Sequence, residues 1–251
     1  MFKIKAYQSI CLFLLMTMPP LSAATGDWHI AVTPYLWDLT MAGQAAVGVN
    51  ETSLERTKWG GMLNVEVHKN QFGIFVNGIY SRMSESKNYG FFQATVTNIF
   101  GIFTGGLSYD VTSSSFQCVS QICALTLQPY VGARYTTKET KLSLSGFFMT
   151  SDYTHDQHWT DPIIGINANL LIAREWLLQL GGDIGGTNRN SQYSYKALGL
   201  LGYQPKALGT HVTFYAGYQI LDQHYVDGIN VDYFNWNMKL YGPLVGLSLS
   251  Y

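Results

Sequence analysis

Apolar and polar residues alternate along most of the chain. In the segment 60–69 the apolar residues Leu63, Val65 and Val67 alternate with the polar residues Asn64, Glu66 and His68. Successive side chains of a strand point to opposite faces, so this period of two predicts a strand with one apolar and one polar face. Beyond the first 24 residues, no stretch approaches the roughly eighteen apolar residues of a membrane-spanning helix.

The same period predicts an all-β chain of about ten strands in one domain. They cover residues 28–41, 60–69, 72–84, 92–110, 125–146, 159–173, 176–186, 192–204, 211–225 and 231–251. Counts of roughly eight or twelve stay open, because some segments are long for one crossing. Short turns at 69–71, 174–175 and 205–209 alternate with longer loops at 43–58, 85–90, 147–158, 187–190 and 227–230. This asymmetry predicts a transmembrane antiparallel up-and-down β-barrel with periplasmic turns.

The last strand carries a second signal. Every second residue of this strand is apolar or aromatic, at Val245, Leu247, Leu249 and Tyr251. A strand of this kind is typical of the closing strand of a bacterial outer-membrane barrel, where the barrel assembly machinery reads it. The alternative is the half-buried terminal strand of a soluble sandwich.

The first 24 residues have the pattern of a secretory signal peptide. Lys3 and Lys5 precede the apolar run 10–18, and small residues close the segment at 22–24. We therefore expect cleavage after Ala24, with the barrel formed by residues 25–251. Together with the last strand, this predicts the outer membrane of a Gram-negative bacterium, with outer-membrane lipids, periplasmic chaperones and the assembly machinery as partners.

Composition agrees with a barrel. Charged residues make up 12% of the chain, about half the usual share, and aromatic residues 14%. Such a balance suits an apolar outer band with aromatic girdles. The net charge of −1 gives no indication of a nucleic-acid partner.

Several segments together resemble a family of uncharacterised Gram-negative outer-membrane β-barrel proteins, described as small and porin-like. They are 33–37, 65–66 with 72–80, 131–135, 159–162 with Gly165, 182–186, 217–219 with Asp222 and Tyr225, and 241–247. The chain departs from the family at Gln219, where an Arg is common, and at its last residue, where Phe is commoner than Tyr. The resemblance implies the fold and the membrane but no activity.

The inner parity collects charged and amide side chains of both signs. The predicted polar network comprises Glu66, Asn77, Arg134, Lys138, Asp161, Asp183 and Lys196. Such groups avoid lipid, where a mid-membrane charge costs roughly 2–4 kcal/mol. They either pair and fill the barrel or line a path or pocket for a small solute. An eight-stranded barrel is just filled by side chains, and ten strands leave little more room.

The segment 151–161 holds the densest cluster of titratable groups. His155, His158 and Asp161 are candidates for a catalytic site at the extracellular rim, in which His155 with Asp156, or His158 with Asp161, assembles with Asp183 or His224. Asp222 and His224 are a further candidate pair. The alternative is a solvated polar loop, since the chain has no HExxH and no Gly-x-Ser-x-Gly motif. We find no metal site and no cofactor motif.

Cys118 and Cys123 form an even pair in an oxidising compartment once the leader with Cys11 is removed, which predicts a disulfide. Half of a metal site is the alternative. For the whole chain we expect a non-enzymatic barrel with a structural or surface role, or one that binds or passes a small solute. An outer-membrane hydrolase with a His/Asp rim site stays the alternative, and the oligomeric state stays open.

Overall fold

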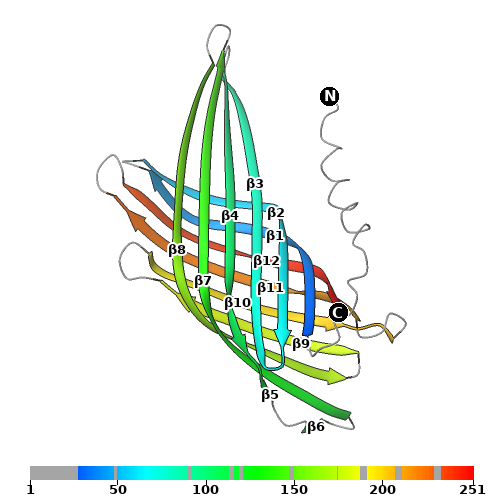
Figure 1. The fold of residues 1–251 in the computed structure, drawn as a ribbon. Coiled ribbons are helices and arrows are strands. Elements are labelled where there is room, and N and C mark those ends of the chain that lie inside the picture. The colour runs from blue at the N-terminus through cyan, green and yellow to red at the C-terminus, as the bar shows by residue number, and fades with distance from the viewer. Residues whose placement is uncertain are drawn as a thin grey trace.

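In the computed structural model the chain forms a closed antiparallel β-barrel (Figure 1). The structure describes residues 28–47, 50–89, 92–112, 116–118, 121–146, 150–173, 175–186, 191–206, 211–228 and 233–251. The ten long strands are β1 (Trp28–Val47), β2 (Asn50–Lys69), β3 (Phe72–Tyr89), β4 (Phe92–Tyr109), β7 (Gln121–Gly146), β8 (Thr150–Ala173), β9 (Trp176–Gly185), β10 (Ser191–Tyr203), β11 (Val212–Asp227) and β12 (Phe234–Ser250). Two short strands, β5 (Val111–Thr112) and β6 (Phe116–Cys118), pair with the beginning of β7.

The ring closes through two pairings. β1 pairs with both β2 and β12, and β4 pairs with β7 past the short strands. Every long strand therefore has two antiparallel neighbours, which satisfies the backbone groups of a barrel without leaving an edge. The predicted up-and-down barrel and its ten strands are confirmed. No helix within the described ranges is long and apolar enough to cross a membrane.

Several predicted loops are strand instead. The range 43–58 was predicted as a loop, but β1 continues to Val47 and β2 begins at Asn50. β3 likewise continues to Tyr89, and β8 begins at Thr150. Figure 1 shows β3, β4, β7 and β8 extending farthest at this end. Above the lipid both faces of a sheet can meet water, so pairing continues where the alternation that marks a membrane strand ends.

The opposite end has the short turns that the sequence predicts. Asn70 adopts a positive φ of 55° between β2 and β3, a conformation that Asn tolerates well. β8 ends at Ala173 and β9 begins at Trp176, as expected for a turn at 174–175. Tight turns at one end and long hairpins at the other give the barrel its polarity.

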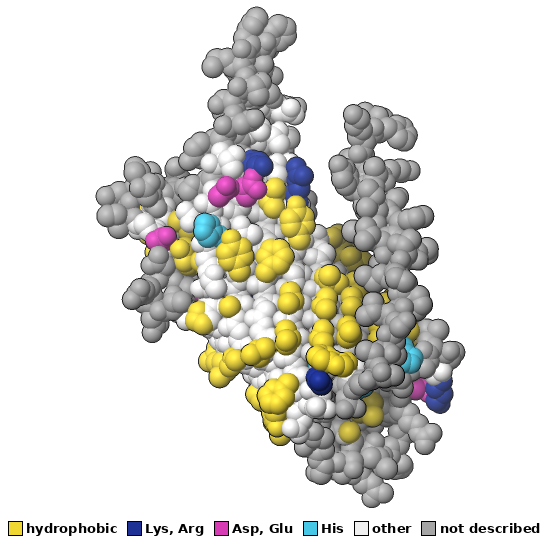
Figure 2. All heavy atoms as spheres, viewed as in Figure 1, with side chains coloured by type: hydrophobic (Ala, Val, Ile, Leu, Met, Phe, Trp, Pro, Cys, Tyr) yellow, Lys and Arg dark blue, Asp and Glu magenta, His cyan; other side chains and the backbone are white. Residues whose placement is uncertain are grey.

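The outward parity carries an apolar band, visible on the face in Figure 2. Exposed residues between the girdles include Leu36, Ile74, Val76, Leu107, Val131, Ile164, Ile166, Leu180, Ile184 and Val245. Exposed aromatic residues near the turn end are Trp28, Phe72, Tyr109, Trp176, Tyr203 and Tyr251, and those near the other end are Trp59, Tyr80, Tyr135, Tyr193 and Tyr195. Two aromatic girdles around an apolar band are the surface of a membrane barrel.

The last strand lies as its parity predicts. Val245 and Tyr251 are exposed on the outer face, while Leu244 and Ser248 are buried inside. Tyr251 closes the ring by exchanging backbone hydrogen bonds with Ile30, at N···O distances of 2.9 and 2.8 Å. The reading of this strand by the assembly machinery stays a prediction. The predicted signal peptide, residues 1–24, lies outside the described residues.

The outer face generates a depth-dependent prediction. Ile166 and Ile172 both point outward from β8, but Ile172 lies beside the turn-end girdle and Ile166 near the middle of the band. Ile166→Arg should lower the free energy of unfolding by about 2–4 kcal/mol, and Ile172→Arg by about 0–1 kcal/mol, because arginine at the midplane is buried in hydrocarbon. Denaturant titration in lipid vesicles measures both. Equal effects would contradict a membrane-spanning band here.

Candidate functional site

The predicted polar network does line the interior. Arg134, Asp161 and Asp183 are almost fully buried inside the barrel. Glu66, Asn77 and Lys196 border an internal pocket, and Lys138 reaches inward over aromatic rings. All seven predicted residues therefore take the inner parity, although they do not form one continuous network.

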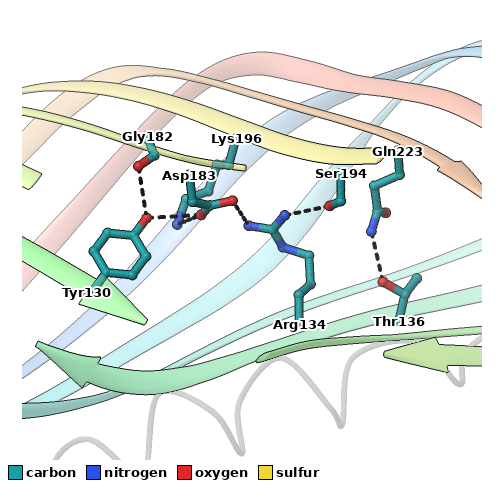
Figure 3. A network of polar contacts seen from close by, with 8 residues as sticks. All are labelled: Tyr130, Arg134, Thr136, Gly182, Asp183, Ser194, Lys196 and Gln223. Carbon is teal, nitrogen blue, oxygen red and sulfur yellow. Dashed lines mark hydrogen bonds and ion pairs between the residues drawn. The ribbon is translucent and has the colours of Figure 1, made fainter. Parts of the chain in front are cut away.

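A buried ion-pair cluster joins β7, β9 and β10 inside the barrel (Figure 3). Arg134 on β7 places Nη2 at 2.6 Å from Asp183 Oδ1 on β9 and donates from Nη1 to Ser194 Oγ on β10 at 2.6 Å. Asp183 Oδ2 accepts a hydrogen bond from the Tyr130 hydroxyl at 3.0 Å and lies 3.4 Å from Lys196 Nζ. The Asp183 carboxylate thus contacts two cations, and the Arg134 and Asp183 side chains are buried, where a lone charge would be costly.

A second contact closes the barrel just beyond this cluster. Gln223 Nε2 on β11 donates to Thr136 Oγ1 on β7 at 3.0 Å, and both side chains are fully buried. Strands β8, β9 and β10 lie between the two in the ring, so the bond joins distant walls. Asp161, paired in register with Arg134, is also fully buried at this level. Side chains therefore occupy the lumen here.

The interior beyond these contacts is apolar and aromatic. The Trp159 ring stacks on Tyr225 at 4.5 Å, and Phe100 on β4 stacks on Trp236 of β12 at 5.8 Å between centroids. Lys138 Nζ lies 4.9 Å from the centre of the Trp236 ring, on the strand diametrically opposite its own. This aromatic plug, comprising Phe100, Trp159, Tyr225, Phe234 and Trp236, fills the end of the lumen away from the tight turns.

The sequence analysis missed this plug because it treated the inner parity as polar throughout. A signal was present at the start of β12, where Phe234, Trp236, Met238 and Leu240 take the inner parity. The outer parity there is Asn235, Asn237 and Lys239. Apolar-inside and polar-outside is the pattern of a strand surrounded by water, opposite to the pattern of its membrane part.

A polar pocket lies on the other side of the ion-pair cluster, toward the tight turns. Six amide side chains line it, namely Asn64, Asn77, Gln128, Asn167, Gln179 and Gln219. The rings of Tyr35, Phe75 and Tyr130 contribute apolar surface, and Glu66 and Lys196 are its charged members. We take this amide pocket as the candidate functional site.

Glycines on neighbouring strands make room for two of these rings. Tyr130 pairs with Gly165, and a Cβ added at Gly165 would overlap the Tyr130 ring. Tyr35 pairs with Gly246, where an added Cβ would overlap the Tyr35 ring in the same way. Each tyrosine therefore lies over the neighbouring strand and presents its ring to the pocket, an arrangement that needs glycine for the close approach.

A chain of polar contacts surrounds the turn-side mouth of the amide pocket. His68 stands between two carboxylates, with Nε2 at 3.5 Å from Glu66 Oε2 and Nδ1 at 3.3 Å from Asp110 Oδ2. Asp110 Oδ1 accepts a hydrogen bond from Gln128 Nε2 at 2.9 Å, and Gln128 accepts one from Asn167 at 3.0 Å. The His68, Glu66 and Asp110 side chains are partly exposed, in contrast to the Arg134–Asp183 pair.

The predicted rim site does not assemble as proposed. His158 is exposed on the outer face beside Tyr135, whereas Asp161 is buried inside. The prediction placed the 147–158 segment in a loop, but from Thr150 onward it belongs to the continuous strand β8, in which positions three apart lie on opposite faces. The His155 side chain lies outside the described part of the structure. Asp222 faces outward too, where it accepts a hydrogen bond from Tyr195 at 2.9 Å, and His224 contacts Tyr193.

Neither a metal centre nor a disulfide can be assigned. Among the described residues no group of three or more His, Cys, Asp or Glu side chains is arranged to hold a metal ion. Cys118 aligns with Gln121, and Cys123 with Phe116, in the pairing of β6 with β7. The two cysteine side chains lie outside the described part, so the bridge stays a prediction.

Comparison with known proteins bears on the fold. No protein-family model matches the chain, and no curated protein matches it. Among solved structures, the outer membrane protease OmpT from Escherichia coli is similar with a TM-score of 0.58 and 11% identity, over 90% of this chain and 98% of that one. Ail, the attachment invasion locus protein of Yersinia pestis, matches with a TM-score of 0.39 and 8% identity, over 90% and 99%.

The likeness to OmpT confirms the resemblance to outer-membrane β-barrel proteins at the level of the fold. The chain has the fold of that class, in agreement with the outer-membrane location expected from the sequence. At 11% identity the likeness to OmpT extends no further than the fold.

The ion-pair cluster generates a stability prediction. Asp183→Ala should lower the free energy of unfolding by about 3–5 kcal/mol, because Arg134 and Lys196 would then lie in the interior without their carboxylate. Asp156→Ala, which removes an exposed carboxylate on β8, serves as the control and should change it by no more than about 0.5 kcal/mol. Urea titration of both refolded variants measures the difference. Equal stabilities would leave the cluster without a structural role.

Proposed function

We propose that the chain is a non-enzymatic outer-membrane barrel that binds a small polar solute in the amide pocket and does not conduct it across the membrane. The observation that carries the proposal is the division of the lumen. One half holds a polar pocket, and the other half is filled by the aromatic plug and the contacts between its walls.

Two successive layers support a closed lumen. The Arg134–Asp183 pair and the Gln223–Thr136 hydrogen bond form the first layer. The second layer is the aromatic plug, in which Phe100 meets Trp236 from across the barrel. Moving a hydrated solute past both layers would require breaking buried charge contacts and displacing stacked rings, each unfavourable in a water-free interior.

The orientation follows from the turns. In bacterial barrels the short turns face the periplasm and the longer connections face outward. The amide pocket lies on the side of the tight turns, at residues such as Glu66 and Gln128, so its ligand would arrive from the periplasm. The plug would then close the extracellular end.

A hydrolase at the extracellular rim is the alternative function. The described residues supply no observation in its favour, because His158 and Asp161 lie on opposite faces of β8. The interior offers a more complete arrangement, with six amides, two charged groups and three rings around one space. We therefore propose binding rather than catalysis.

Conductance distinguishes a closed binding barrel from a channel. The refolded protein in planar bilayers should show no steady current in salt solution, while a porin inserted under the same conditions gives the positive control. Asp183→Ala should remain silent as well, because the aromatic plug is left intact. A stable ohmic conductance of the unmodified protein would show that the lumen is open and would contradict the proposal.

A further inference from the structure

We infer that the ligand of the amide pocket is a small, neutral polyhydroxylated molecule. The inference rests on the proposed function and narrows it to a chemical class. It follows from the balance of charge in the pocket, from the kind of polar group left available there, and from the rings in its wall.

Both charged members of the pocket already have partners. Glu66 accepts a hydrogen bond from Asn64 at 2.7 Å and lies 3.5 Å from His68. Lys196 lies 3.4 Å from Asp183. A charged ligand would therefore enter a partly desolvated site without an unpaired counter-charge, at a substantial cost in free energy. The pocket favours a ligand without net charge.

The remaining polar groups are mainly amides. An amide offers acceptor and donor atoms side by side, which matches a hydroxyl group that donates and accepts. Gln219 is the clearest unpartnered group. It is 3% exposed, and its Nε2 has no hydrogen-bond partner among the described residues. A buried donor of this kind is unfavourable in the empty pocket and becomes satisfied by an acceptor oxygen on a ligand.

The wall also offers flat apolar surface. Tyr35, Phe75 and Tyr130 border the pocket, and the Phe75 and Tyr130 rings meet edge to face at 5.2 Å. An aromatic face packs well against the C–H face of a saturated ring, while the amides serve the hydroxyls at its edge.

Calorimetric titration of the refolded full barrel tests the ligand class. The neutral probes are glucose, galactose and myo-inositol, and the charged probes are their counterparts glucuronate, galacturonate and myo-inositol 1-phosphate. At least one neutral probe should bind saturably. For a neutral probe that binds, the charged relative of the same ring should bind at least about tenfold more weakly, because its charge stays uncompensated.

A matched pair of variants locates the binding. Gln219→Leu should weaken the neutral probe by about tenfold while leaving the empty protein as stable as the parent or more so, because it removes an unsatisfied buried donor. Gln223→Leu changes the same residue type outside the pocket. It should leave the affinity unchanged but lower the unfolding temperature by removing the hydrogen bond to Thr136. If Gln219 had only a structural role, Gln219→Leu would lower the stability of the protein and leave its affinity for the neutral probe unchanged.

Different outcomes bear on the ligand class and on the proposed function. Charged probes that bind as tightly as neutral ones would overturn the ligand class and leave a solute-binding barrel. Failure of all three neutral probes to bind would overturn the ligand class as well. The proposed function is judged independently by the bilayer experiment, where a steady current would overturn it whatever the titration shows.

Discussion

The number of strands in the ring determines how side chains pack inside this barrel. Ten strands set the walls far enough apart for side chains of distant strands to meet but not to pass one another freely. Gln223 bonds Thr136 across three intervening strands, and Lys138 reaches the Trp236 ring on the opposite wall. The described interior is therefore packed where side chains are large, and it opens into the amide pocket where amides and glycine-backed tyrosines leave space.

The surroundings of the strands change along their length, and the sequence pattern changes with them. In the membrane part of β12, Val245 faces outward and Ser248 inward. At its start, away from the tight turns, the order is reversed, with Trp236 buried and Lys239 exposed. The same strand thus belongs to a lipid-facing barrel at one end and to a water-facing one at the other. The reversal produces an apolar plug at the outer end and a polar pocket at the inner end.

Much of this architecture was predictable from the sequence, because a strict period of two reports the membrane-spanning part of each strand. The strand number, the turns around Asn70 and at 174–175, and the inward side of Arg134 and Asp183 followed from parity alone. The pattern could not show that β1 and β2 extend into the range 43–58, because alternation ends above the lipid while hydrogen bonding continues. The Arg134–Asp183 contact and the Tyr130–Gly165 packing depend on three-dimensional proximity, which parity does not contain.

The central claim is that distant walls touch and close the lumen, and a double-mutant cycle between Thr136 and Gln223 tests it most directly. Thr136→Val and Gln223→Leu are made singly and together, and the free energy of unfolding in lipid vesicles is measured for each. A bond across the barrel predicts a coupling energy of about 0.5–1.5 kcal/mol between the two positions. Strict additivity of the two substitutions would mean that the walls do not meet there, and it would contradict the closed interior.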